Sequence, residues 1–182
     1  VTFLSRLNDL ANGGEQGFKN VTFERYVLGA ILDEVVYGAN LRLQTMSRNR
    51  YSLERSDYTG GGRGKQGLDL AVMDAFTGQS RPANTLSGGE TFLASMALAL
   101  GLADVIQSYA GGIHMDTMFI DEGFGTLDPD TLELAMETLV KLQSSGRLIG
   151  MISHVPELKT RIPAHLEVTR GDDGSTAKFV IN

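Results

Sequence analysis

The stretches Leu86-Ser87-Gly88-Gly89-Glu90 and Met118-Phe119-Ile120-Asp121-Glu122 decide the expected fold, because each is a motif of phosphate chemistry at a predicted element boundary. The first has the spacing of a capping box, in which the serine caps a helix and the glutamate reaches back to the serine backbone. Glycines in a first helical turn cost stability through backbone entropy, so this pair indicates that another group approaches the main chain closely. A phosphate suits that place, since free N–H groups and the helix dipole both favour an anion.

The second motif puts two carboxylates at the end of an apolar strand, where they are costly unless a positive group lies opposite. Mg²⁺ bound to phosphate oxygens accepts such a carboxylate, and the strand end delivers Asp121 to it. Glu122 points elsewhere and, in a phosphoryl-transfer site, orients and activates the attacking water. An exposed acidic pair and a simple helix cap are the alternatives for the two motifs taken singly. Their combination, about 30 residues apart, favours the phosphate interpretation.

Two further positions belong to the same hypothesis. Asp128 precedes Pro129, which predicts an N-cap followed by proline in the first helical position. The turn from Gly125 to Asp128 has room for a second task at a contact between subunits. His154 follows the apolar run Leu148 to Ile152, at the end of a strand where the ligands of open α/β sheets collect.

A complete ATP site also needs a glycine-rich loop with a lysine and a metal-binding hydroxyl. The one glycine-lysine cluster runs from Thr59 to Gln66, and it has threonine in place of the first glycine and glutamine in place of the hydroxyl. It is predicted to be an ordinary loop. The sequence therefore predicts half of an ATP site.

Periodicity predicts an α/β fold. A long helix with an apolar stripe is expected over 22 to 46, capped by Thr22, and a buried helix over Glu90 to Gln107. Thr117 to Ile120 and Leu148 to Ile152 are expected to be parallel strands joined by a helix. The remaining expected elements are a helix end over 4 to 12 closed by Gly13-Gly14, two strands near 50 to 55 and 67 to 74, a crossover helix from Pro129 to Gln143, and a terminal hairpin near 165 to 170 and 176 to 181.

The composition narrows the class of protein. The net charge of −6 argues against a surface that binds polyanions everywhere, but residues 42 to 65 hold a local excess of basic residues. This stretch could meet a phosphate backbone, or it could be a solvated hairpin that acids elsewhere in the chain balance. Without cysteine there is no disulfide or thiolate metal site, and without a long apolar run we expect no membrane partner and a cytoplasmic location. The basic residues are Arg42, Arg48, Arg50, Arg55, Arg63 and Lys65, against Glu54 and Asp57.

The stretches Thr85 to Asp104 and Phe119 to Asp128 resemble the SbcC family of double-strand-break repair ATPases, within the ABC and SMC-type ATPases. The resemblance covers most of the chain. It implies the C-terminal half of a P-loop ATPase head, with a mostly parallel sheet, flanking helices and a terminal β-hairpin. Residues 1–12 would be the end of a coiled-coil or linker helix, and residues 13–182 the C-terminal lobe. The lysine loop would then belong to an N-terminal half, in a longer protein of which this chain is a piece.

The resemblance also implies a role for each site residue, with ATP and Mg²⁺ as cofactors. The signature segment would contact ATP held by the opposing head, so that catalysis requires a dimer. By that likeness the signature segment is Ser87, Gly88, Gly89 and Glu90, the Mg²⁺-linked carboxylate is Asp121, the residue that activates water is Glu122, the residue in the loop that crosses the dimer contact is Asp128, and the switch histidine is His154.

The implied function is ATP-driven dimerisation of heads that regulates a partner nuclease on DNA ends, in the bacterial cytoplasm near the nucleoid. The implied partners are the N-terminal ATPase half, a second head, an SbcD-type nuclease subunit and double-stranded DNA. The chain alone is expected to turn over little or no ATP. One alternative is the head of a chromosome-organising SMC ATPase, whose residues usually differ at Gly123-Phe124-Gly125-Thr126. Another is a non-catalytic DNA clamp, in which Glu122→Gln should change nothing.

Overall fold

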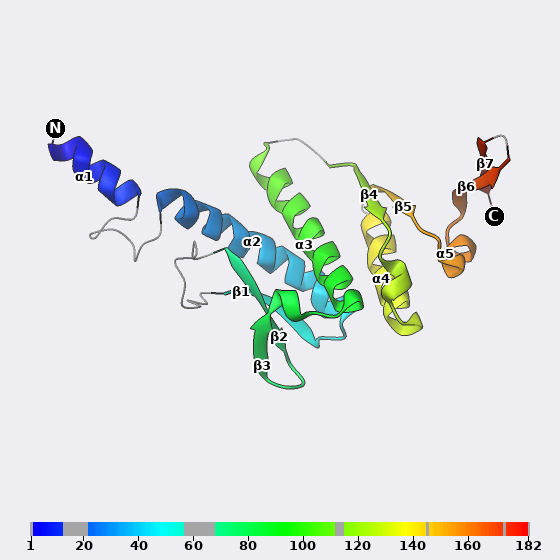
Figure 1. The fold of residues 1–182 in the computed structure, drawn as a ribbon, viewed down its shortest axis with the longest axis horizontal. Helices are drawn as coiled ribbons and strands as arrows, with labels where there is room; N and C mark the ends of the chain where they lie inside the picture. The colour runs from blue at the N-terminus through cyan, green and yellow to red at the C-terminus, as the bar shows by residue number, and fades with distance from the viewer. Residues whose placement is uncertain are drawn as a thin grey trace.

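A computed structural model describes residues 2–12, 22–56, 68–111, 115–144, 146–172 and 174–181. The molecule is elongated, with helix α1 at one end and the hairpin β6–β7 at the other (Figure 1). Its elements are α1 (Thr2–Ala11), α2 (Phe23–Met46), β1 (Tyr51–Ser56), β2 (Asp69–Asp74), β3 (Gln79–Pro82), the 3-10 turn η1 (Ala83–Thr85), α3 (Gly88–Tyr109), β4 (Thr117–Asp121), the 3-10 turn η2 (Phe124–Thr126), α4 (Pro129–Ser144), β5 (Leu148–Ile152), α5 (Pro156–Arg161), β6 (Ala164–Gly171) and β7 (Gly174–Ile181).

The described strands form three sheets, and the predicted α/β class is confirmed. Strands β4 and β5 pair in parallel, with Thr117 opposite Leu148 and Asp121 opposite Ile152, and α4 is the crossover helix between them. Strands β6 and β7 form the expected terminal hairpin. Strands β1, β2 and β3 form an antiparallel sheet in that order, so parallel pairing is the smaller part of the described sheet structure.

Both long helices begin at the residues that the sequence indicates. The Thr22 side chain accepts a hydrogen bond from the Arg25 amide at 3.3 Å and caps α2. At the start of α3, the Ser87 hydroxyl accepts from the Glu90 amide at 3.4 Å, and Oε2 of Glu90 accepts from the Ser87 amide at 2.9 Å. The predicted capping box is therefore present.

The sequence prediction missed β3 and α5. Strand β3 has the sequence Gln79-Ser80-Arg81-Pro82, which lacks apolar alternation and ends in a residue that cannot donate to a ladder, so its pattern is that of a loop. Helix α1 begins at Thr2, two residues before the predicted start. Gly13-Gly14 and the whole glycine-lysine loop from Thr59 to Gln66 lie outside the described residues.

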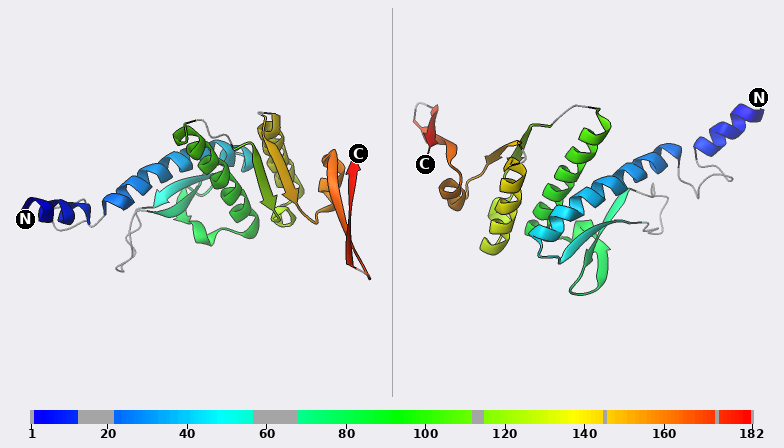
Figure 2. Two further views of the ribbon diagram at one scale, coloured as in Figure 1. Left: turned by 90° about the horizontal axis from the view of Figure 1, so that it is seen from above. Right: turned by 180° about the vertical axis from the view of Figure 1, so that it is seen from behind.

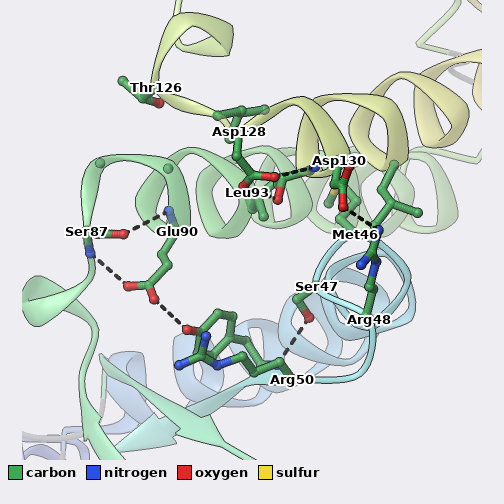
Figure 3. A pocket seen from close by; sticks show the side chains of 16 residues that line it. Met46, Ser47, Arg48, Arg50, Ser87, Glu90, Leu93, Thr126, Asp128 and Asp130 are labelled. Atoms are coloured by element: carbon green, nitrogen blue, oxygen red, sulfur yellow. Dashed lines mark hydrogen bonds and ion pairs between the residues drawn. The ribbon is translucent and has the colours of Figure 1, made fainter.

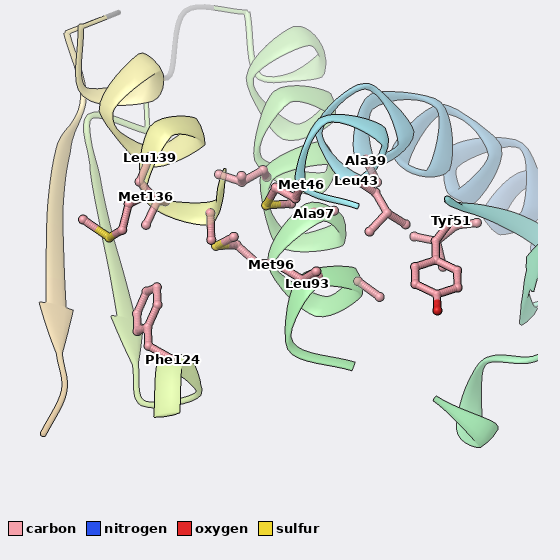
Figure 4. Packing of buried hydrophobic residues seen from close by; sticks show 14 of the residues in the cluster. Ala39, Leu43, Met46, Tyr51, Leu93, Met96, Ala97, Phe124, Met136 and Leu139 are labelled. Atoms are coloured by element: carbon pink, nitrogen blue, oxygen red, sulfur yellow. The ribbon is translucent and has the colours of Figure 1, made fainter. Parts of the chain in front are cut away.

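The core lies where α2, α3 and α4 meet, and Figure 4 shows its side chains. Leu43 of α2 and Leu100 of α3 are almost completely buried. The two helices approach closely at Gly101, where an added Cβ would clash with the Val35 carbonyl oxygen. Helix α3 is apolar enough and long enough to cross a bilayer by composition and length alone. Several of its residues form the centre of this core, and a core helix of a folded domain passes the same criteria.

The strands beyond the core leave apolar surface uncovered. Phe119 of β4 is 73% exposed and Leu148 of β5 is 63% exposed. An apolar groove of about 530 Å³ lies between α3 and β4 and reaches Asp121 at its end. From above, α3 and the pair β4–β5 stand side by side, and α4 lies behind the two strands (Figure 2).

Candidate functional site

A cavity of about 560 Å³ opens at the first turn of α3. Figure 3 shows it between that turn, the end of α2 and the start of α4. Its walls include Ser87, the two glycines that follow it, and Thr126 of η2. Arg48 and Arg50 supply cations from the opposite side, and Asp128 and Asp130 supply carboxylates.

The Glu90 carboxylate accepts hydrogen bonds from three different residues. Its Oε1 accepts from the Tyr51 hydroxyl at 2.5 Å, and its Oε2 accepts from Nη2 of Arg81 at 3.1 Å and from the Ser87 amide at 2.9 Å. Burial opposes ionisation, but the hydrogen bonds from Tyr51, the Ser87 amide and Arg81 outweigh it and hold the pKa of Glu90 at about 2. Burial and the same carboxylate raise the pKa of Tyr51 to about 12.

The two glycines of the first turn lie against η2 of the same chain. A Cβ on Gly89 would stand 3.0 Å from the carbonyl oxygen of Thr126, and one on Gly88 would stand 3.7 Å from Cγ2 of Thr126. The close approach that these glycines indicate is thus made at Gly89 by the chain itself. A phosphate is not needed to explain that residue.

The acidic pair lies at the end of β4, with its two side chains in different surroundings. Asp121 is exposed at the strand end. Glu122 has φ +57°, its amide donates to the Ile152 carbonyl at 2.9 Å, and its Oε2 lies 2.9 Å from Nδ1 of His154. The left-handed backbone at Glu122 is uncommon for a residue with a side chain. It turns Glu122 toward the end of β5 and brings two predicted catalytic residues into contact.

Asp128 caps α4, as predicted. Its Oδ1 accepts from the Thr131 amide at 3.0 Å and its Oδ2 accepts from the Thr131 hydroxyl at 2.6 Å. These bonds from the Thr131 hydroxyl and amide lower the pKa of Asp128. Between Asp121 and this cap, Gly123 at φ +99° and the turn η2 reverse the chain.

The predicted site residues therefore fall into two groups. Ser87, Gly88, Gly89, Glu90 and Asp128 line the cavity at the start of α3. Asp121, Glu122 and His154 are absent from its walls and lie at the ends of β4 and β5, on the other side of η2.

The fit of Mg²⁺ rests on Asp121. Within the described ranges no three His, Asp or Glu side chains gather to hold a metal by themselves. One exposed carboxylate at a strand end fits an ion that takes most of its ligands from nucleotide phosphates and water. When bound, such an ion would neutralise charge that develops on the phosphates.

The basic stretch 42 to 65 is largely paired with acids. Its described arginines each contact a carboxylate, which leaves little free positive charge for a phosphate backbone. Arg63 and Lys65 lie outside the described residues. The pairs are Arg42 with Asp104 at 2.6 Å, Arg48 with Asp130 at 3.4 Å, Arg50 with Asp74 at 3.0 Å and Arg55 with Asp33 at 2.8 Å.

Sequence reasoning missed Tyr51 and Arg81 as neighbours of the capping box. They lie 39 and 9 residues from Glu90, on two different strands. No local spacing rule links them, and β3 itself was not predicted. The sequence around Arg81 marks it only as a charged residue in a stretch with a weak strand pattern.

Comparison with known proteins agrees with the motifs. Residues 63–141 match the family model described as SbcC/RAD50-like, Walker B motif. Over 174 residues the chain is 52% identical to the SbcC subunit of the nuclease SbcCD of Vibrio cholerae, an alignment that covers 96% of this chain and 17% of that protein. Over 164 residues it is 52% identical to the same protein of Staphylococcus haemolyticus, covering 90% of this chain and 16% of that protein. The chain thus spans about a sixth of these relatives.

Solved structures agree on the fold. A structure described in work on ATP-driven dimerisation and DNA-stimulated activation of SMC ATPases superposes with a TM-score of 0.62 at 16% identity, over 86% of this chain and 89% of that chain. The Smc head domain of Pyrococcus yayanosii gives 0.63 at 15% identity, over 85% and 28%. At this identity the likeness concerns the fold of an SMC-type head alone. With about half of its residues identical to the SbcC subunit of SbcCD over nearly all of its length, the chain belongs to the SbcC family.

Proposed function

We propose that this chain is the C-terminal half of an ATPase head whose ATP site is completed by an N-terminal half and by a second head. The observation that carries the proposal is the separation of the site residues into two groups on either side of η2. Among the described residues, Ser87 lines the cavity at the start of α3, whereas Asp121 lies at the end of the groove between α3 and β4. Two heads that face each other can bring the turn of one to the acidic pair of the other.

The proposed chemistry uses the two groups in turn. Asp121 holds the Mg²⁺ that accompanies ATP, and Glu122 accepts a proton from the attacking water while His154 orients its carboxylate. The amide groups at the start of α3 face the γ-phosphate of the opposing head. ATP would then favour the engaged pair of heads, and hydrolysis would release it.

The uncovered apolar surface supports an N-terminal half as a partner. The groove between α3 and β4 ends at Asp121, so a segment that fills it would also reach the nucleotide. Phe119 lies beside this groove and is largely exposed. Burying such a side chain yields about 1.5–3 kcal/mol, which a partner segment would gain.

The wider role follows from the relatives. They are named as the SbcC subunit of the nuclease SbcCD, so we propose an SbcD-type nuclease subunit and double-stranded DNA as partners, in the bacterial cytoplasm. Because the basic stretch is paired with acids, DNA contact is assigned to the assembled head and not to this stretch. The higher identity to SbcC proteins favours this assignment over a chromosome-organising SMC protein.

Steady-state ATP turnover tests the proposal. The chain is measured alone, mixed with the N-terminal half of the same protein, and mixed after Glu122→Gln. Turnover in the mixture that the substitution abolishes is the expected result. Turnover by the chain alone would contradict a split site.

A non-catalytic clamp is separated by the same samples. A clamp predicts no turnover in any sample, together with ATP-dependent association that Glu122→Gln leaves unchanged. Glu133→Gln, on the exposed side of α4, serves as the matched control for loss of a carboxylate.

A further inference from the structure

The signature turn is tied to the antiparallel sheet by the Glu90 network, which consists of Tyr51, Arg81, Ser87 and Glu90. Tyr51 comes from β1 and Arg81 from β3, so two outer strands reach the same carboxylate. Figure 3 shows the Glu90 carboxylate turned back toward the Ser87 amide and toward the side of the cavity where Arg50 lies. Both oxygens of Glu90 are engaged within the chain.

Arg81 donates hydrogen bonds to two residues of the turn, Thr85 and Glu90. Its Nη2 donates to Glu90, and its Nη1 donates to the Thr85 carbonyl at 2.7 Å and to the Thr85 hydroxyl at 3.1 Å. The segment from Thr85 to Glu90 is therefore held at both ends by one guanidinium. The planar fork of arginine makes such a double contact, which a lysine cannot reproduce.

Tyr51 is itself fixed from behind. Its backbone amide donates to Oγ of Ser47 at 3.1 Å, and the guanidinium of Arg50 lies 4.7 Å from the centre of its ring. Arg50 is in turn bound to Asp74 of β2 at 3.0 Å. Tyr51, whose hydroxyl donates to Glu90, is therefore also held by Ser47 and Arg50.

We propose that Tyr51 and Arg81 are positioning residues for the turn from Ser87 to Glu90, and that they set the orientation in which this turn meets the nucleotide of the opposing head. The inference rests on the proposed composite ATP site. It also revises the role of Glu90, whose carboxylate acts as the anchor of the turn and makes no contact with ATP.

A merely structural role is distinguished by its effect on nucleotide affinity. A side chain that only stabilises the fold lowers the melting temperature and leaves the ATP dependence of the folded protein unchanged. A positioning residue raises the ATP concentration needed for half-maximal head engagement and half-maximal turnover. Since the turn binds substrate and transition state alike, KM rises and kcat stays near its original value.

The experiment uses the full-length protein that contains this chain, with its nuclease subunit. Head engagement with a non-hydrolysable ATP analogue is followed by sedimentation, and KM and kcat for ATP are measured in parallel. Tyr51→Phe and Arg81→Gln are each expected to raise both half-maximal concentrations by about tenfold or more, because each variant loses at least one hydrogen bond to the charged Glu90 carboxylate. Arg81→Lys, which keeps the charge, should recover part of this loss.

Tyr109→Phe is the matched control, because the Tyr109 hydroxyl also donates to a glutamate, Glu34, at 2.9 Å, on the far end of α3. It should leave both concentrations unchanged. In a Glu90→Ala background, Tyr51→Phe should add nothing, because the acceptor of its hydroxyl is gone, and Arg81→Gln should add only the loss of its two contacts with Thr85.

Unchanged half-maximal concentrations in Tyr51→Phe and Arg81→Gln would overturn the inference while wild-type turnover upholds the proposed function. If the wild-type protein engages its heads but does not hydrolyse ATP, the proposed ATPase activity is refuted. The half-maximal ATP concentration for engagement then decides whether Tyr51 and Arg81 are positioning residues. Wild-type protein that neither engages nor hydrolyses would refute both.

Discussion

At the scale of single residues, the site depends on the hydrogen bonds of one carboxylate and on the absence of a side chain at one glycine. Glu90 combines three donors on one half-buried carboxylate, and Gly123 lies directly under an aromatic ring. Neither residue can be replaced without a measurable cost, and each cost has a separate physical cause.

Glu90 should make stability depend on acid. The pKa of its carboxyl is about 2 in the folded chain against 4.5 for the free group, so the stabilisation is complete above pH 4.5 and is lost as the pH falls toward 2. The free energy of unfolding should fall by up to about 3 kcal/mol over this range. Urea unfolding of the chain at several pH values measures it. Glu90→Gln should lack this component, and an identical pH dependence in that variant would contradict the assignment.

Gly123→Ala should destabilise the chain by about 2–5 kcal/mol. Gly123 has φ +99°, and an added Cβ would clash with the ring of Phe92, which packs edge-on against Phe124 at 4.8 Å between ring centres. The control is Gly78→Ala, which has φ +65° with no atom within 4 Å of the added Cβ. It should cost about 1–2 kcal/mol, and equal losses in thermal unfolding would exclude a steric clash.

At the scale of elements, helix α3 joins the core to the site. Leu100 is 1% exposed and packs among buried residues of the core cluster, while Leu102 on the same helix is 45% exposed beside the groove to β4. One helix thus presents a packed face to α2 and an open face to whatever covers the strands.

Leu100→Ala should lower the free energy of unfolding by about 2–5 kcal/mol, because it leaves a cavity in the packed core. Leu102→Ala removes the same atoms from the open face and should cost less than about 1 kcal/mol in the chain alone. Chemical denaturation of both variants gives the comparison. A loss at Leu102 as large as that at Leu100 would mean that the open face is already covered.

The elements that the sequence predicts are those with local signals. Thr22 and Ser87 mark helix starts by capping, and the turn beginning at Gly171 marks the terminal hairpin. Strand β3 has no such signal, because its polar residues are ordered by pairing with β2, which depends on the whole sheet. The residues of the site likewise divide into those with a local sequence signal and those without one.

The motif residues of the site are recognisable by their spacing along the chain. Their supporting partners Tyr51, Arg81 and Thr126 meet them through tertiary contacts. That acids elsewhere balance the basic stretch was one of the two interpretations of the sequence, but the individual partners could not be predicted, because Asp104 and Asp130 come from distant helices.

At the scale of the whole molecule, the chain has a finished interior on one side of β4–β5 and an open apolar surface on the other. The relatives are about six times longer, so there is ample sequence to cover it. Phe119, the exposed phenylalanine of β4, is the best position at which to test which segment covers this surface.

Phe119→Ala should weaken binding of the N-terminal half by tenfold or more, because burying a phenylalanine is worth about 1.5–3 kcal/mol. Phe119 is 73% exposed in this chain, so its own folding should change little. Phe76→Ala is the control, since Phe76 is 76% exposed on the β2–β3 turn, away from the groove. Titration calorimetry measures the affinity of each variant for the N-terminal half. Equal affinities would place the partner elsewhere.

The backbone of Glu122 has one more consequence. Its left-handed torsion is held by the bond from its amide to the Ile152 carbonyl of the neighbouring strand, and such a torsion persists only while its surroundings hold it. A slip of β5 by one residue would remove that carbonyl and turn every β5 side chain to the opposite face. The position of the Glu122 carboxylate is therefore set during folding, when β4 and β5 pair in one register, and it does not depend on a bound nucleotide.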